Sequence, residues 1–190
     1  MRSLRSAVVL PVVMAGGVSV MLGACAIGTS APESEGNSSM SRVQLYDDID
    51  SLVSDSDVVV VGRVAEQEVV ADIDPITDFT LSRVLVDEVV SGDAVEVGDA
   101  VVVRQLGSAE QAAPVEILAA GKTYLLYLTE SGLDGSLASQ FYVTGANAGI
   151  YEQEAANDLA RGSSDPLFVQ SGPQEDEQLP SEIRRSGAAG

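Results

Sequence analysis

The chain has 190 residues, 45% of them hydrophobic, which is enough for one domain with an apolar core but not for two large domains. Acidic residues outnumber basic ones 29 to 10, and a net charge of −19 disfavours binding to nucleic acid or to anionic headgroups. Histidine is absent and cysteine occurs once, which excludes the commonest general base, the commonest zinc ligand and any internal disulfide.

Residues 1–24 have the layout of a signal peptide. A basic start with Arg2 and Arg5 precedes an apolar stretch, residues 7–22, that proline and glycine interrupt. This stretch is shorter than the roughly 20 residues that a membrane-spanning helix needs. Removal of both arginines with the signal peptide would change the formal charge from −19 to −21.

The single cysteine, Cys25, follows one aliphatic and two small residues, Leu22, Gly23 and Ala24. This pattern resembles the lipobox of bacterial lipoproteins, in which the cysteine thiol receives a diacylglycerol. The resemblance implies a diacylglycerol-type lipid with acyl chains such as palmitate on Cys25, no other cofactor, and anchoring at the extracytoplasmic face of the cell membrane. Two acyl chains suffice for this, since each buried methylene contributes about 0.8 kcal/mol. The alternatives are an ordinary signal peptide with an incidental cysteine and an uncleaved anchor.

Residues 25–41 are predicted to form a lipidated flexible tether, because they are rich in serine, glycine, proline and glutamate and lack apolar periodicity. A tether of about sixteen residues has an r.m.s. reach of about 20 to 25 Å, which would hold the folded domain clear of the headgroups. At the other end, residues 161–190 are expected to be a largely disordered acidic tail. The folded domain is therefore predicted within residues 42–160.

This domain is predicted to begin with a short helix, because Leu45, Ile49 and Leu52 recur at helical spacing. Segments rich in branched apolar residues follow and indicate strands. Gly62 interrupts the first of them and predicts a bulge or a bend. The expected strands lie within residues 57–70, 78–90, 100–107, 121–131 and 139–145.

The expected fold class is all-β, with five or six strands and one or two short helices, because helices and strands do not alternate along the chain. This pattern favours a small, partly open barrel or a sandwich. The order of "SDVVVVGRV", "VDEVVSGD", "VGDAVVVRQLG", "LAAGKTYLLYL" and "YVTGANAGIY" is similar to the OB-like β-barrel of netrin-like modules and tissue inhibitors of metalloproteinases. The resemblance covers Asp57 to Tyr151. The inhibitory residues of that family do not carry over, because they require a free N-terminal cysteine and disulfide-linked segments.

Two groups of acidic residues are candidate calcium ligands, because hard cations prefer several oxygen ligands. The second group lacks the central glycine of an EF-hand loop, and Arg83 stands where that loop has its final acid. The prediction is therefore a solvated acidic surface with no metal site. The two groups are Asp47, Asp48, Asp50, Asp55 and Asp57, and Asp72, Asp74 and Asp78.

Lys122, the one lysine of the chain, could activate a serine, and a pair of carboxylates could perform glycoside hydrolysis. Lys122 instead follows a glycine turn at the start of an apolar strand, which favours a solvated ammonium group. No glycine motif for binding phosphate is present. We therefore expect no catalytic residue and no enzymatic activity.

Aromatic residues gather in residues 124–151, and most of them are expected to pack in the core. Tyr127 and Tyr142 are the candidates for lining a groove that binds a neutral ligand. The leading hypothesis is a non-enzymatic lipoprotein of the bacterial cell envelope that binds an envelope protein, a peptide or a glycan. The alternatives are a protease inhibitor, by analogy with the barrel, and a hydrolase that uses carboxylates or Lys122.

Overall fold

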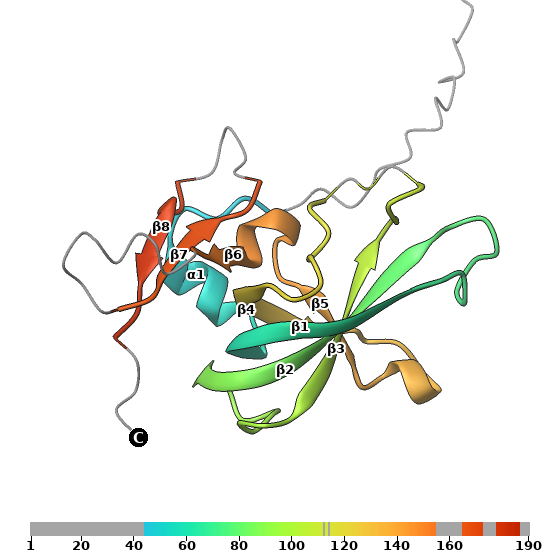
Figure 1. Cartoon of the computed structure of the whole chain (residues 1–190), viewed down its shortest axis with the longest axis horizontal. Helices are drawn as coiled ribbons and strands as arrows, with labels where there is room; N and C mark the ends of the chain where they lie inside the picture. Colours follow the sequence, from blue (N-terminus) through green and yellow to red (C-terminus); the bar gives the residue numbers. More distant parts are fainter. Residues whose placement is uncertain (1–43, 112, 114, 155–164, 173–177, 187–190) are drawn as a thin grey trace, which may run out of the picture. The chain divides into compact units, whose positions relative to one another are not determined.

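The computed structural model describes residues 44–111, 113, 115–154, 165–172 and 178–186. The predicted signal peptide, the lipobox with Cys25 and the whole of the predicted tether, residues 25–41, lie outside these residues. The chain divides into units 1–40 and 41–190, and every described element belongs to the second. The elements are α1 (Ile49–Ser54), β1 (Val58–Val70), β2 (Phe79–Ser91), β3 (Ala100–Leu106), β4 (Thr123–Glu130), η1 (Gly135–Leu137), β5 (Gln140–Val143), η2 (Ala146–Gly149), β6 (Ile150–Gln153), β7 (Leu167–Gln170) and β8 (Glu182–Arg184) (Figure 1).

The domain is mostly β, as predicted, and its strands form one mixed sheet of eight strands in the order β1-β2-β3-β5-β4-β6-β7-β8. An additional pairing of β1 with β4 joins β1, β2, β3, β5 and β4 into a ring. The ring is partial, because β5 has four residues and meets β3, in parallel, at only two residue pairs. It is therefore not a true barrel but one part of a larger sheet.

The described residues contain eight strands where five or six were expected. Strands β6, β7 and β8 extend the sheet from β4 through antiparallel pairing. Both β7 and β8 fall within residues 161–190, for which a largely disordered tail was expected. Each has only three or four residues, so its apolar content is too small to stand out from the surrounding polar sequence.

The short helix is confirmed and begins at Ile49. The side chain of Asp48 caps it by accepting a hydrogen bond of 2.7 Å from the backbone N–H of Ser51. Leu52 turns its side chain into the protein interior, where it is fully buried. Ile49 and Val53, both half-buried, pack against the same cluster, so three apolar residues fix this short capped helix against the sheet.

The bulge predicted at Gly62 is also confirmed, because the register between β1 and β2 shifts between Val61 and Gly62. A Cβ atom at Gly62 would lie 2.6 Å from the carbonyl oxygen of Leu85, which is closer than side chains tolerate. Glycine therefore allows the two backbones to approach at the bend.

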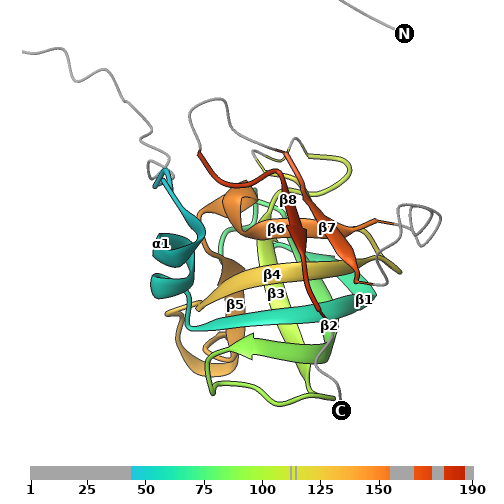
Figure 2. The same ribbon diagram turned by 90° about the vertical axis from the view of Figure 1, so that its left-hand side faces the viewer.

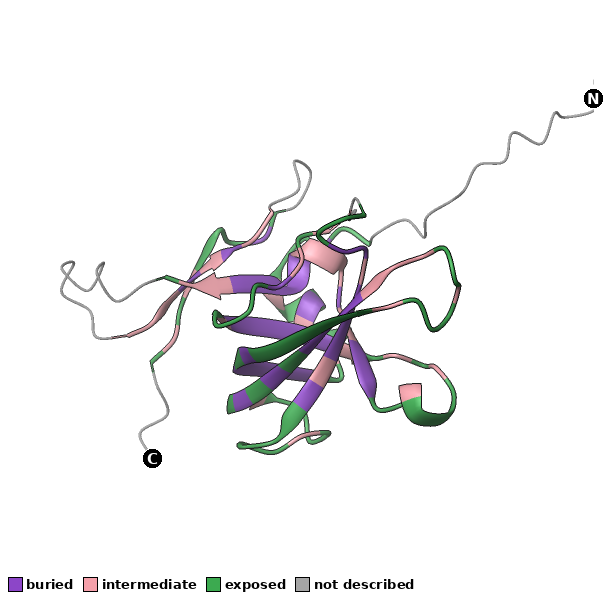
Figure 3. Ribbon diagram, turned by 45° about the vertical axis from the view of Figure 1, so that its right-hand side comes forward, coloured by how far each residue is buried: buried purple, intermediate pink, exposed green. Residues whose placement is uncertain are grey.

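The sheet has a buried apolar cluster on each of its faces. The inner cluster lies within the ring and draws on β1 to β5, with Val84, Leu126 and Phe141 among its members. The outer cluster draws on α1, β1, β4, β6 and β7, and Ile183 of β8 packs against it; in Figure 2, which looks onto this side, β8 crosses in front of β4 and β6. Burial on both faces explains why residues 58–61 are four consecutive valines (Figure 3).

Candidate functional site

Asp48, Asp55 and Asp57 of the first predicted acidic group are used for local structure. Asp55 accepts hydrogen bonds from Gln44 and Tyr46. Asp57 accepts from the backbone N–H of Glu130 at 2.7 Å and from the Thr129 hydroxyl at 2.8 Å. These two donors lower the pKa of Asp57, because they stabilise its ionised form. Asp57 therefore fastens the start of β1 to the end of β4.

The second predicted acidic group lies in the loop between β1 and β2, and its carboxylates also bind protein donors. Asp72 pairs with Arg104, Asp74 accepts from the Thr77 hydroxyl at 3.1 Å, and Asp78 accepts from the Ser108 hydroxyl at 2.7 Å. Within the described ranges, no three acidic or cysteine side chains are grouped so that they could hold a metal ion. The loop thus uses its acids to hold its own shape.

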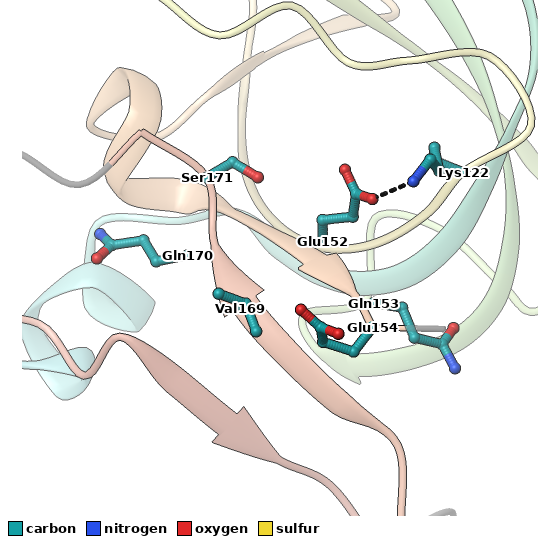
Figure 4. A pocket seen from close by; sticks show the side chains of 7 residues that line it. All are labelled: Lys122, Glu152, Gln153, Glu154, Val169, Gln170 and Ser171. Carbon is teal, nitrogen blue, oxygen red and sulfur yellow. Dashed lines mark hydrogen bonds and ion pairs between the residues drawn. The ribbon is translucent and has the colours of Figure 1, made fainter. Parts of the chain in front are cut away.

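Lys122 lies at the edge of a polar hollow of about 380 Å³ between β4, β6 and β7 (Figure 4). Its ammonium group forms an ion pair with the carboxylate of Glu152. Both the hydrogen bond and the charge of Glu152 raise the pKa of Lys122, so the amine stays protonated. A lysine that acts as a base needs a lowered pKa instead. The full lining is Lys122, Glu152, Gln153, Glu154, Val169, Gln170 and Ser171.

The two tyrosines predicted to line a groove lie in different surroundings. Tyr127, on β4, is buried in the outer cluster, where its ring centroid is 6.1 Å from that of Tyr151. Burial raises the pKa of Tyr127. Tyr142 is half-buried on β5, opposite Thr129 of β4. Tyr142 is therefore the more accessible of the two.

Sequence reasoning missed the most unusual polar residue of the domain, Arg104, whose side chain is fully buried on β3. Its two terminal nitrogens donate to both carboxylate oxygens of Asp72, at 2.7 and 2.8 Å, and its Nε donates to Gln140 at 2.7 Å. The guanidinium also lies over the ring of Phe79, 4.9 Å from its centroid. The available signal was an arginine within the apolar segment "AVVVRQL".

A second hollow, of about 420 Å³, opens beside β1, β2 and β3. Leu81 and Val102 supply apolar surface, while the exposed Glu66, Glu68 and Arg83 supply charges of both signs. Arg83 is exposed, and none of the ion pairs formed by described residues involves it. This combination of an apolar surface with a few polar groups is typical of small binding sites. Gln67 completes the lining.

Comparison with known proteins gives no relative. No family model, no curated protein and no solved structure matches the chain. Among the helices that the structure describes, none has the length and the apolar character that a membrane span requires.

Proposed function

We propose that the protein is a non-enzymatic lipoprotein, anchored through Cys25 at the extracytoplasmic face of the cell membrane, that binds an envelope protein, a peptide or a glycan. The lipobox supports the anchor. The hollow beside β1, β2 and β3 is the observation that carries the binding part. In this proposal the partial ring is an OB-like barrel in an open form, and such barrels bind their ligands on the face of the second and third strands.

The chemistry of the hollow suits a ligand with both apolar and hydrogen-bonding groups. Leu81 and Val102 offer apolar contact, and Glu66 and Arg83 can accept from and donate to amide or hydroxyl groups. A nucleic acid is a poor candidate, because the net charge of −19 repels phosphates.

Substitution of the cysteine tests the anchor. In a bacterial host, we expect full-length wild type to incorporate labelled palmitate and to partition into detergent, and Cys25→Ala to do neither. Ser30→Ala, in the predicted tether, is the matched control and should behave as wild type. Equal detergent partitioning of Cys25→Ala and wild type would remove the lipoprotein proposal.

Charge reversal at the hollow tests the binding part. We expect Arg83→Glu to reduce the retention of envelope peptides and glycans on the immobilised protein by about ten-fold, because it removes the only positive charge of the lining and places a third glutamate beside Glu66 and Glu68. Arg184→Glu, which reverses an exposed charge on β8, should leave retention unchanged. Retention that is equal in both variants would show that the hollow is not the binding site.

A further inference from the structure

The loop that joins β1 to β2, residues 71–78 and hereafter the hairpin loop, exposes large apolar side chains. Ile76 is 81% exposed and Ile73 is 48% exposed. Val69, at the adjoining end of β1, is 56% exposed. These three are half of the large hydrophobic residues that the described part of the chain leaves exposed. Figure 3 shows the loop as an exposed projection beyond the sheet.

The hairpin loop is nevertheless held firmly, first through Asp72. Its carboxylate accepts hydrogen bonds from both terminal nitrogens of Arg104. The Arg104 side chain is fully buried and is held by a hydrogen bond to Gln140 and by the ring of Phe79. A two-pronged bond to a buried guanidinium has one geometry, so the position of Asp72 is fixed. The largest buried polar side chain of the domain therefore serves to fasten an exposed loop.

A tight turn holds the centre of the hairpin loop. The carboxylate of Asp74 accepts from the backbone N–H of Ile76 at 3.1 Å, and from the Thr77 hydroxyl at 3.1 Å. The backbone N–H of Thr77 donates to the carbonyl of Asp74 at 3.2 Å. Pro75 fixes a further backbone angle within this turn. Ile76 is thus presented from a closed turn.

A neighbouring segment, residues 107–111, supports the far side of the hairpin loop. The Gln111 side chain donates to the carbonyl of Ile76 at 3.2 Å and accepts from the backbone N–H of Asp78 at 3.0 Å. Gly107 and Ser108 donate to the backbone carbonyl and the carboxylate of Asp78, both within 2.8 Å. Three separate sets of bonds therefore restrain a loop whose apolar side chains face solvent.

A restrained loop with exposed apolar side chains has the physical properties of a recognition element. Ordering the loop in advance lowers the entropy lost on binding, and burial of the isoleucines would supply the favourable free energy. The hairpin loop and the segment that supports it, residues 71–78 and 107–111, contain four acidic residues and no lysine or arginine. Arg104 neutralises Asp72, and the other three leave the surroundings of the loop negatively charged. The acids are Asp72, Asp74, Asp78 and Glu110.

We propose that the hairpin loop docks on another protein, with Ile76 inserted into an apolar pocket that lysine or arginine residues border. The acidic surroundings select this occupant, because they attract a basic rim and repel anionic headgroups. They also repel a second copy of this chain, which carries the same charges. The contact uses different side chains from the hollow, so it does not depend on the ligand that we propose there.

Site-specific photocrosslinking tests the proposal in the full-length, membrane-anchored chain. A photoreactive residue replaces Ile76, and in a matched control it replaces Val97, which is 66% exposed in the connection between β2 and β3. The probe is the set of proteins in the isolated cell envelope. We expect a discrete protein adduct from position 76 and not from position 97. The adduct should map, by mass spectrometry, to an apolar pocket bordered by basic residues.

Two further variants of the crosslinking protein test the stated chemistry. Glu110→Lys should reduce the adduct by about ten-fold, because it reverses an exposed charge in the segment that supports the loop. Asp72→Asn should reduce the adduct several-fold, because it weakens the bond that holds the loop to Arg104. The unfolding temperature of this variant is measured to check that its domain is folded. The proposal is overturned if position 76 gives no protein adduct, the same adducts as position 97, or adducts only to lipid or to a second copy of the chain.

Discussion

At the scale of single residues, Arg104 shows how a charge can be kept inside an apolar sheet. Each of the three guanidinium nitrogens donates a hydrogen bond, and the ring of Phe79 covers the guanidinium plane. Desolvation is costly, so such a group persists only when its donors are satisfied. Its partners, Asp72 and Gln140, come from segments more than 30 positions away in either direction. This distance is why the sequence alone does not reveal the pair.

Lysine at position 104 tests this account. We expect Arg104→Lys to lower the free energy of unfolding by about 2 kcal/mol, because an ammonium group cannot serve Gln140 and both oxygens of Asp72, and buried acceptors without donors are costly. Chemical denaturation measures the difference. Arg63→Lys, an exposed site on β1, should change the value by less than about 0.5 kcal/mol. Equal effects at both positions would contradict a special role for Arg104.

At the scale of elements, the sequence predicts those whose signal is local. The helix has a capping aspartate and a buried leucine, and the long strands have runs of branched residues, so their existence follows from the pattern. The bulge at Gly62 follows from a glycine within such a run. Strands β7 and β8 are too short to give such a signal and form because they cover the outer cluster. Phe168 of β7, which is 1% exposed, is their main contribution to it.

Truncation of Phe168 tests whether β7 belongs to the folded domain. We expect Phe168→Ala to lower the free energy of unfolding by about 3 to 5 kcal/mol, because it leaves a cavity in the outer cluster. Val169→Ala, a half-buried neighbour on the same strand, is the control and should cost clearly less. Thermal and urea-induced unfolding both report the difference. A Phe168→Ala variant as stable as wild type would mean that β7 contributes nothing to the core.

At the scale of the whole molecule, the ring and the site depend on contacts between distant segments. The composition predicts a mostly β domain, but the pairing of β1 with β4 and of β3 with β5 cannot be read from any single segment. Within the described residues, the acidic residues chosen from the sequence are not grouped as metal ligands, and those such as Asp57 and Asp78 bind protein donors instead. The hollow beside β1, β2 and β3 was not foreseen, because Glu66, Arg83 and Val102 lie on three different strands.

The response of stability to pH follows from the carboxyl groups that accept hydrogen bonds. The pKa values of Asp48, Asp57 and Asp72 are lowered, chiefly by hydrogen bonds from Ser51, Glu130 and Arg104 respectively. A lowered pKa stabilises the folded state above the ordinary aspartate pKa of about 3.9, and this contribution is lost as pH falls through the folded-state value. Acid should therefore remove the stabilising contribution of these three aspartates.

We expect Asp57→Asn to unfold at a lower temperature than wild type near pH 6, with a difference that shrinks as the pH falls below about 4. Unfolding temperatures of both proteins between about pH 2 and pH 7 measure this. Asp87→Asn, at an exposed position of β2, is the control, because it also removes one negative charge from the folded protein. A difference that stays constant over this range would mean that the hydrogen bonds of Asp57 do not favour its ionised form.

The pairing of β1 with β4 also has a consequence for the chain before it folds. Val58 to Arg63 lack their β4 partner until Thr123 to Leu128 have been synthesised. During that interval four consecutive valines, rich in β propensity and without charge, face the solvent or other nascent chains. Such a segment is prone to intermolecular pairing, so a chaperone that binds extended apolar segments would reduce losses during synthesis. The acids that flank it, Asp55 and Asp57, are in place to slow that association.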